Sequence, residues 1–287
     1  MSKKRAFTPL EGLRFAGTQI DISNQGSKRF LTGFTLIELL VVIAIIALLM
    51  TIMMPALARS RQEARAIGCQ SRLSQWGKIF LMYTMDNDGY FASGSSGKMW
   101  TTTLEPYYSE PQLHCCPMAT NPASPEGSAA PVGGKFLAWG AFDSTYAQLG
   151  LEGVYGSYGM NGHVSNPTPG VADPWGRDLQ NNWRSPNVKG ADSIPLFADC
   201  TWLGGLPESY DEPPPYDGAC EYGPLGTNIQ GFCINRHNGF INGLFLDFSV
   251  RRIGLKQLWK LRWHQEFDIN AEPPVWPEWM KNFKDYD

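Results

Sequence analysis

A long apolar segment near the start of the chain is the strongest feature of the sequence. Residues 39–58, LLVVIAIIALLMTIMMPALA, run for 20 positions without a charged side chain. About 20 apolar residues suffice to cross a bilayer as a helix, and Pro55 is tolerated in such a helix. A buried core helix and a cleavable secretory signal are the alternatives. The run is apolar on every face and longer than a signal's apolar region, so it predicts a transmembrane helix over residues 34–58.

The following segment has the spacing of an amphipathic helix. Its apolar positions recur at steps of three and four residues. The members of this stripe are Ala66, Cys69, Leu73, Trp76, Phe80 and Tyr83. Asp88 and Gly89 end the pattern, because glycine readily adopts the left-handed conformation that follows a helix. We expect a stem helix over residues 59–88, continuous with the transmembrane helix and roughly 80 Å long in all. Its apolar stripe would pack against a head.

The remaining residues, 89–287, show no long periodic segment. Runs rich in Gly, Pro and Ser predict loops, and four short runs predict strands: 135–139, 194–198, 241–247 and 249–253. We expect a hairpin turn at Asp247 and Phe248 between the last two, followed by a short amphipathic helix over 255–267. The pattern as a whole predicts an α+β protein, with a long N-terminal helical stem packed on a loop-rich antiparallel β head.

The composition adds a charge division to this picture. The chain has 287 residues and a net charge of −3, which excludes bulk electrostatic binding of nucleic acid. Its 30 Gly and 21 Pro are typical of a loop-rich body rather than a helical bundle. Residues 1–33 carry six basic and two acidic side chains, whereas residues 86–287 carry 13 basic and 23 acidic ones. Arg59, Arg61 and Arg65 form a basic cluster that we expect to be solvated.

The start of the apolar segment carries a family resemblance. The stretch GFTLIELLVVIAIIALL at 33–49 resembles the processing and assembly signal of type IV prepilins and of type II secretion pseudopilins. The resemblance implies that residues 1–33 form a basic leader peptide. A prepilin peptidase would cut between Gly33 and Phe34 and methylate the new N-terminus at Phe34. Glu38, fifth in the mature chain, matches the residue that pairs with a neighbouring subunit's N-terminal amine.

General physical chemistry agrees with a special role for Glu38. A carboxylate inside an apolar membrane segment is costly, so an intramembrane ionisable residue is by default a functional residue. The alternative is an interfacial side chain that reaches the lipid headgroups. In the resemblance, pairing with another copy sets the axial register between subunits.

The resemblance also implies a location and a set of partners. The chain would be a single-pass protein of the bacterial inner membrane, with its leader cytoplasmic and its head periplasmic. It would then enter a surface or periplasmic fibre, either a type IV pilus or a type II secretion pseudopilus. The expected partners are a prepilin peptidase, other pilin-like subunits and inner-membrane lipid, without nucleic acid. The role would be structural and not enzymatic, and no cofactor is expected.

The C-terminal part carries a second resemblance. RHNGFINGLFLDFSV is similar to a C-terminal motif of a large pilin-like bacterial family, in which His is followed after nine residues by Asp and Gly. His237 and Asp247 keep this spacing, but Phe248 replaces the Gly that suits a tight hairpin turn. We interpret the pair as turn residues that bracket a strand, with a catalytic or metal-binding pair as the alternative. The other histidines, His114, His163 and His264, add no ligand spacing, so no metal site is expected.

The six cysteines have no Cys-x-x-Cys spacing. They stand at positions 69, 115, 116, 200, 220 and 233. An even number suits disulfides in an exported head. We expect Cys69 to bond Cys115 or Cys116, which would join stem to head, and Cys220 to bond Cys233. Buried free thiols are the alternative.

Two other functions compete with a structural subunit. The first is a membrane-anchored surface protein that binds carbohydrate or another polymer on an aromatic face. Its candidate side chains are Tyr155, Tyr158, Trp175, Trp183 and Trp202. The second is a membrane-anchored enzyme with His237 and Asp247 in its site. The head offers no nucleophile elbow and no phosphate-binding loop, so the structural function is favoured.

Overall fold

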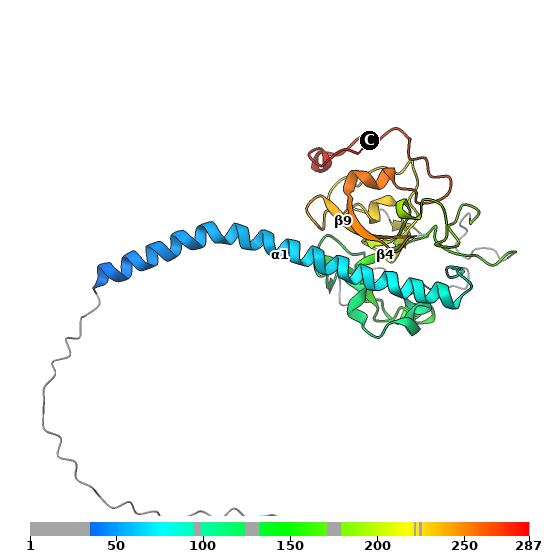
Figure 1. Cartoon of the computed structure of the whole chain (residues 1–287), viewed down its shortest axis with the longest axis horizontal. Helices are drawn as coiled ribbons and strands as arrows, with labels where there is room; N and C mark the ends of the chain where they lie inside the picture. Colours follow the sequence, from blue (N-terminus) through cyan, green and yellow to red (C-terminus); the bar gives the residue numbers. More distant parts are fainter. Residues whose placement is uncertain are drawn as a thin grey trace, which may run out of the picture. The chain divides into compact units, whose positions relative to one another are not determined.

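The first element of the computed structural model is one long helix (Figure 1). Helix α1 (Leu36–Asp86) has 51 residues and runs through Pro55 without a break. It ends where Asp88 and Gly89 take positive φ angles of 54° and 81°. The helix expected over the transmembrane and stem segments is therefore confirmed. It is also long and apolar enough to cross a membrane.

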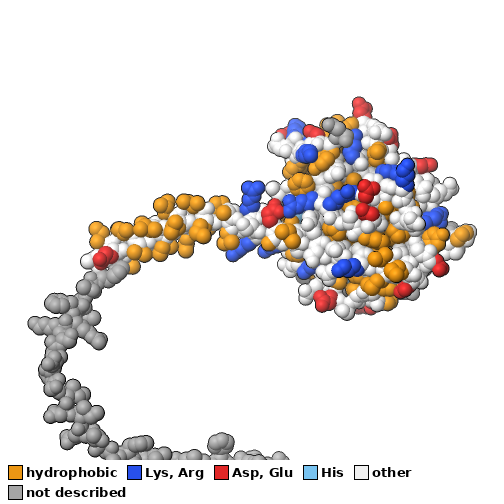
Figure 2. Space-filling model, in the orientation of Figure 1, with side chains coloured by type: hydrophobic (Ala, Val, Ile, Leu, Met, Phe, Trp, Pro, Cys, Tyr) orange, Lys and Arg blue, Asp and Glu red, His pale blue; other side chains and the backbone are white. Residues whose placement is uncertain are grey.

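The chain divides into two units, Met1–Ile52 and Met53–Asp287. The structure describes residues 35–94, 99–123, 132–170, 179–220, 222–223 and 226–286. The expected leader at 1–33, with Gly33 and Phe34, lies outside these described ranges. Within the first unit, large apolar side chains from Leu36 onward are exposed, which gives α1 the orange surface of Figure 2.

The second half of α1 supplies one wall of the core in the Met53–Asp287 unit. The buried members of the expected stripe are Ala66, Cys69, Leu73, Trp76 and Phe80, and Tyr83 is partly buried. The stripe is therefore confirmed. Arg59, Arg61 and Arg65 are exposed, as expected for a solvated basic face. Burying a large apolar side chain contributes about 1.5–3 kcal/mol, so this face of α1 is a major stabilising surface.

A seven-stranded sheet lies against this helix. Its strand order is β10-β9-β5-β4-β6-β8-β7, and it is antiparallel except where β6 pairs in parallel with β4 and β8. The strands are β4 (Tyr158–Asn161), β5 (Pro195–Asp199), β6 (Gly204–Gly205), β7 (Tyr222–Gly223), β8 (Gly226–Thr227), β9 (Phe240–Phe245) and β10 (Val250–Gly254). Strands β5 and β9 are neighbours in this sheet, are buried almost throughout and pack against α1. The expected α+β architecture is therefore confirmed.

Short elements complete the head. A small sheet joins β1 (Asn121–Pro122), β2 (Leu137–Gly140) and β3 (Tyr155–Gly156). The short helical elements are α2 (Trp100–Thr103), η1 (Glu105–Tyr107), η2 (Pro111–His114), η3 (Ser144–Leu149), η4 (Ala191–Ser193), η5 (Ile229–Gly231), η6 (Leu255–Lys260) and η7 (Glu278–Met280). All four expected strands have counterparts in β2, β5, β9 and β10. The amphipathic helix expected over 255–267 is shorter and forms as the 3₁₀ element η6.

Contacts between α1 and the sheet fix where the helix crosses it. Gln70 Nε2 donates to Asn242 Oδ1 of β9 at 3.0 Å. A Cβ built on Gly77 would lie 3.1 Å from Leu244 Cδ1, so the missing side chain lets β9 approach closely. An ion pair also joins Glu63 of α1 to Arg252 of β10.

The expected β9–β10 hairpin is confirmed, with an unusual residue in its turn. Asp247 Oδ1 accepts hydrogen bonds from Ser249 N at 3.0 Å and Ser249 Oγ at 2.7 Å. Phe248 has φ 62°, a conformation that favours glycine. This backbone conformation suits the Gly that stands here in the similar motif, and Phe248 adopts it at a steric cost.

Candidate functional site

The start of α1 forms a capping box around Thr35 and Glu38. Glu38 N–H donates to Thr35 Oγ1 at 3.3 Å, and Glu38 Oε2 accepts from Thr35 N at 2.8 Å and Thr35 Oγ1 at 2.6 Å. Reciprocal bonds of this kind satisfy two backbone donors that a helix start leaves without intrahelical partners. The Thr-x-x-Glu spacing is itself a signal for this capping box, and it is a third role for Glu38 beside intermolecular pairing and an interfacial position. Both of Glu38's bonds use Oε2, and the side chain is exposed.

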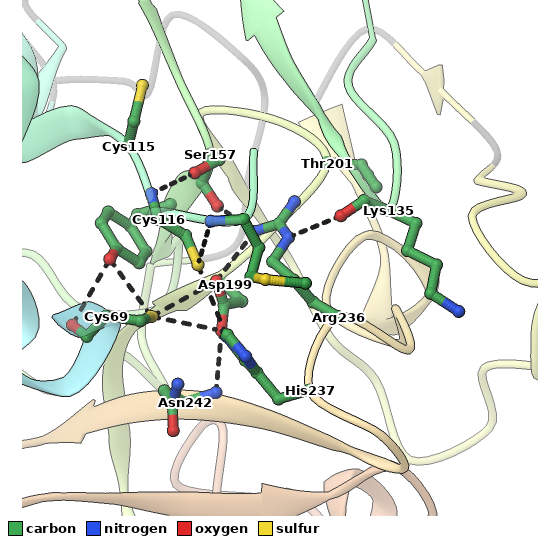
Figure 3. Close-up of polar contacts among 12 residues, drawn as sticks. Cys69, Cys115, Cys116, Lys135, Ser157, Asp199, Thr201, Arg236, His237 and Asn242 are labelled. Atoms are coloured by element: carbon green, nitrogen blue, oxygen red, sulfur yellow. Dashed lines mark hydrogen bonds and ion pairs between the residues drawn. The ribbon is translucent and has the colours of Figure 1, made fainter. Parts of the chain in front are cut away.

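A second candidate site is buried in the head, where four segments meet (Figure 3). Its side chains come from α1, from the turn after η2, from the last residue of β5 and from the loop before β9. They are Cys69, Cys116, Asp199 and His237. One ligand-type atom from each lies within 4.8 Å of the other three. Both thiols and the carboxylate are fully buried, and His237 is 8% exposed.

The distances show how closely these groups face one another. His237 Nε2 lies 3.4 Å from Cys116 Sγ and 3.2 Å from Asp199 Oδ2. Cys69 Sγ lies 3.7 Å from the same carboxylate oxygen. One imidazole nitrogen therefore faces both a sulfur and a carboxylate. A Cys–His–Asp catalytic relay would use opposite ring nitrogens for the two partners, so this arrangement does not match that relay.

A buried arginine holds the carboxylate from the other side. Arg236 NH1 donates to Asp199 Oδ1 at 2.8 Å and to Ser157 O at 2.6 Å. Its remaining nitrogens donate to the carbonyls of Gly134 and Lys135. A buried charge is tolerated only when it is paired and hydrogen-bonded. The guanidinium thus joins the strand ends around the cluster and neutralises Asp199.

Further hydrogen bonds reach the cluster from its surroundings. Asn242 N–H donates to Asp199 Oδ2 at 2.8 Å, and Tyr158 OH donates to Cys69 Sγ at 3.2 Å. Met118 N–H donates to Cys116 Sγ at 3.5 Å. Each of these donors favours a negative charge on the atom that accepts from it.

The proximity of these groups shifts their protonation. Burial acts to raise the pKa of Cys116, but hydrogen bonds from Cys69 and His237 and the charge of Arg236 bring it to about 7. Burial acts to lower the pKa of His237, but Asp199 raises it to about 9. Burial, together with the hydrogen bond to Cys116, raises the pKa of Cys69. Asp199 stays ionised despite burial, because His237 and Arg236 hold its pKa well below the usual range.

The structure separates the two residues of the C-terminal motif. His237 lies in the buried cluster, whereas Asp247 lies in the exposed β9–β10 turn and binds Ser249. The turn interpretation is right for Asp247 and incomplete for His237, whose carboxylate partner is Asp199. Sequence reasoning missed Asp199 and Arg236. The available signal was an acidic residue at the end of an apolar strand, in IPLFAD, which is unusual in a core position.

All six cysteines are free thiols in the structure. Neither expected disulfide is formed in the structure. Cys115 points away from the cluster (Figure 3), and Cys116 faces His237 instead. Cys233 is buried with its sulfur 3.9 Å from Met280 Sδ. Cys69 and Cys116 are neighbours, but as two ligand-type thiols and not as a bonded pair.

The histidines also behave differently from the expectation. His163 and His264 meet at Glu208, with His264 Nε2 at 2.9 Å and His163 Nε2 at 3.9 Å from its two carboxylate oxygens. The sequence spacing of these histidines therefore does not show which side chains meet in the fold. Two such groups occur within the described residues, because folding brings together side chains that are far apart in sequence.

The aromatic side chains proposed for a binding face are mostly core residues. Tyr158, Trp183 and Trp202 are buried, and Tyr155 is 37% exposed. Trp175 lies outside the described residues. The described members of this set therefore do not form an exposed aromatic face. Three of them are core residues, and only Tyr155 is partly exposed.

Comparisons with known proteins concern the N-terminal part of the chain. Residues 32–54 match the family model of the prokaryotic N-terminal methylation motif. The chain is 45% identical over 58 residues to the type IV wide pilus major component PilA4 of Thermus thermophilus. It is 37% identical over 57 residues to a ComG operon protein 3 homolog of Bacillus licheniformis. The expected prepilin-type signal is therefore confirmed.

The matched part is limited in both directions. Each alignment covers 20% of this chain, and the two cover 44% and 59% of the respective relatives. The chain thus spans about half the length of the curated relatives it matches. No solved structure matches the chain.

Proposed function

We propose that this protein is a pilin-like structural subunit, made as a membrane precursor and assembled into a fibre through helix α1. One observation carries the proposal: the methylation motif at residues 32–54 coincides with the start of α1 and its exposed apolar surface. An unpartnered apolar surface of this size needs lipid or other apolar helices to cover it. Membrane storage followed by helix-to-helix assembly meets that need at both stages.

The processing step follows from the same motif. We propose that a prepilin peptidase cuts between Gly33 and Phe34 and methylates Phe34. The new amine would then lie beside the first turn of α1, four residues before Glu38. In an apolar surrounding, a carboxylate and an ammonium of adjacent subunits stabilise each other strongly, since neither is hydrated there. This pairing would set the axial register of the fibre.

We further propose that the protein spans the bacterial inner membrane once. The leader would face the cytoplasm and the head the periplasm. The fibre is of the type IV pilus or type II secretion pseudopilus kind, and both relatives named above are compatible with such a role. The burial of Tyr158, Trp183 and Trp202 removes most of the support for a polymer-binding face, and the arrangement at His237 does not support an enzyme.

The test is the N-terminus of the mature protein. The full chain is expressed with a prepilin peptidase in a bacterial host, isolated from membranes and analysed by mass spectrometry. We expect an N-terminal Phe34 that carries one methyl group on its nitrogen. Gly33→Val should remain uncut, while Gly26→Val, an equal change elsewhere in the leader, should be cut as in the wild type. A terminus elsewhere, or an uncut wild-type chain, would overturn the processing proposal.

Assembly needs its own readout. Fibres are sheared from cells that carry the complete assembly system and probed for the head by immunoblotting. We expect the mature chain in the sheared fraction, and none in the fraction from Gly33→Val cells. A mature chain that is found only in the membrane fraction would contradict the fibre role while leaving the processing step intact.

A further inference from the structure

The buried cluster converges on one point in the head. Four side chains from four chain segments each aim one ligand-type atom at the others. We propose that this site binds one divalent ion of the zinc class through four side chains: Cys69, Cys116, Asp199 and His237. The ion would join α1 to the head from within. The site is independent of the methylation motif, so it goes beyond the proposed function.

The spacing of the four atoms fits a tetrahedral ion. Zinc binds sulfur at about 2.3 Å and nitrogen or oxygen at about 2.0–2.2 Å, which places neighbouring ligands of a tetrahedron about 3.3–3.7 Å apart. Three of the six ligand-to-ligand distances are close to these values: 3.4 Å from Cys116 Sγ to His237 Nε2, 3.2 Å from His237 Nε2 to Asp199 Oδ2 and 3.7 Å from Cys69 Sγ to Asp199 Oδ2. All four ligand-type atoms lie within 4.8 Å of one another. The site needs little rearrangement to accept an ion.

The donor set selects the class of ion. Two thiolates and an imidazole are soft or borderline ligands that favour zinc, whereas calcium and magnesium prefer six or more oxygens. Four protein ligands in a buried place fill a tetrahedral ion completely. Such closed sites are structural, and catalytic zinc sites keep one position open for water.

The charges around the site also balance for a divalent ion. Two thiolates cancel the double positive charge of the ion, and binding releases their protons and that of the imidazole to solvent. The remaining negative charge is the carboxylate of Asp199, which Arg236 already neutralises through Oδ1. Arg236 bonds Oδ1, and Oδ2 faces the cluster, so the arginine and the ion would take different oxygens of one carboxylate.

A second layer of hydrogen bonds holds the ligands in place. Tyr158 OH donates to Cys69 Sγ, Met118 N–H to Cys116 Sγ, and Asn242 N–H to Asp199 Oδ2. Outer partners of this kind orient metal ligands and tune their affinity. A cavity of about 130 Å³, lined in part by Arg236 and His237, adjoins the cluster at His237.

Metal content is the direct test. The full chain is purified in detergent under reducing conditions, and its metals are measured by mass spectrometry of the elements. We expect about one zinc per chain in the wild type and at least a tenfold loss in the Cys69→Ser, Cys116→Ser double variant. Cobalt(II) loaded in place of zinc should give the visible absorption of a tetrahedral thiolate site, again lost in the double variant.

Two control variants separate this site from other sources of metal. Cys115→Ser removes the adjacent buried thiol, which points away from the cluster, and should keep the zinc. His264→Gln alters the group around Glu208 and should also keep it. Zinc that persists in the cysteine double variant, or that leaves with His264→Gln alone, would overturn the proposal.

A third measurement does not depend on how the variants fold. The wild-type chain is refolded in detergent with zinc, with magnesium or with a chelator, and its Tm is compared. We expect zinc alone to raise Tm by roughly 10 °C, and equal Tm values would overturn the proposal. Freshly isolated protein is also alkylated and mapped without reduction. A disulfide between Cys69 and Cys116 in that sample would overturn it as well, because those sulfurs would no longer be ligands.

Discussion

Glu38 carries two roles that one side chain can satisfy in turn. In the single chain its carboxylate caps the start of α1 by binding Thr35. In the proposed fibre the same carboxylate pairs with the N-terminal amine of a neighbour. A substitution that removes the whole polar side chain of Glu38 would remove both roles at once. It could not show which of the two roles assembly requires.

A pair of substitutions separates the two roles. Gln is an accepted capping-box residue, so Glu38→Gln should keep the start of α1 while removing the charge. Charge-assisted bonds contribute about 1.5–3 kcal/mol, so we expect the sheared fibre fraction to fall about tenfold or more in this variant. Membrane insertion should be unchanged, as measured by the amount of the chain in the extracted membrane fraction.

Glu38→Val is the matched comparison, because it removes both the cap and the charge. It should also insert normally and fail to assemble. Wild-type amounts of fibre from Glu38→Gln cells would show that the carboxylate acts only as a cap, and the register role would be wrong.

Single residues also show where sequence reasoning reached its limit at the buried cluster. His237 stood out through its motif, and Cys69 through its place on the apolar stripe. Asp199 and Arg236 did not, because their roles depend on partners that only folding brings close. A buried ion pair leaves no periodic signal in the sequence. Spacing rules for metal sites detect ligands from one short segment, and these ligands come from four.

Among the elements, the β9–β10 hairpin tests a backbone argument. Phe248 has φ 62°, and left-handed backbone costs a residue with a Cβ about 1–2 kcal/mol. Phe248→Gly and Phe248→Ala lose the same aromatic ring, so their difference reports the backbone alone. We expect the Gly variant to be more stable than the Ala variant by about 1 kcal/mol, measured by urea unfolding of the head.

The same comparison at Val250 is the control. Val250 lies in strand β10, paired with Leu244 of β9. In a strand Gly is less stable than Ala by roughly 0.5–1 kcal/mol, so the order should reverse at this position. An Ala variant at 248 that equals or exceeds the Gly variant would show that the turn relaxes without strain.

The elements that could be predicted were those with a long or regular pattern. Helix α1 followed from an apolar run and a stripe at steps of three and four. Strands β5 and β9 followed from short, largely apolar runs, and β10 followed from its place after the hairpin turn. Strands β6, β7 and β8 have two residues each, too few for any pattern. Segment 255–267 had a helical pattern, but it forms only the 3₁₀ turn η6, which tertiary contacts shape more than periodicity does.

At the scale of the whole molecule, α1 belongs to two different environments. Its first part presents apolar side chains outward, and burial along it begins only at Ala66. From there the helix supplies the head with Cys69, Leu73, Trp76 and Phe80. The Trp76 ring, for example, lies 5.2 Å from that of Trp100 and 5.1 Å from that of Phe197, centroid to centroid. Its Nε1–H also donates a hydrogen bond to Leu113 O. The head is therefore a unit that includes half of the helix.

This division predicts where the chain can be shortened. A chain that begins at Arg59 keeps every buried residue of α1, so we expect it to fold without detergent, with a Tm within about 3 °C of the head in the full chain. A chain that begins at Leu81 loses the buried stripe. Truncating a tryptophan such as Trp76 costs about 3–5 kcal/mol, and domains have only about 5–15 kcal/mol to lose. We therefore expect the second chain to show no cooperative unfolding transition when it is heated and monitored by circular dichroism.

Cooperative unfolding of the chain from Leu81 would show that the sheet is stable without the helix. Failure of the chain from Arg59 would place part of the head's stability in the apolar segment.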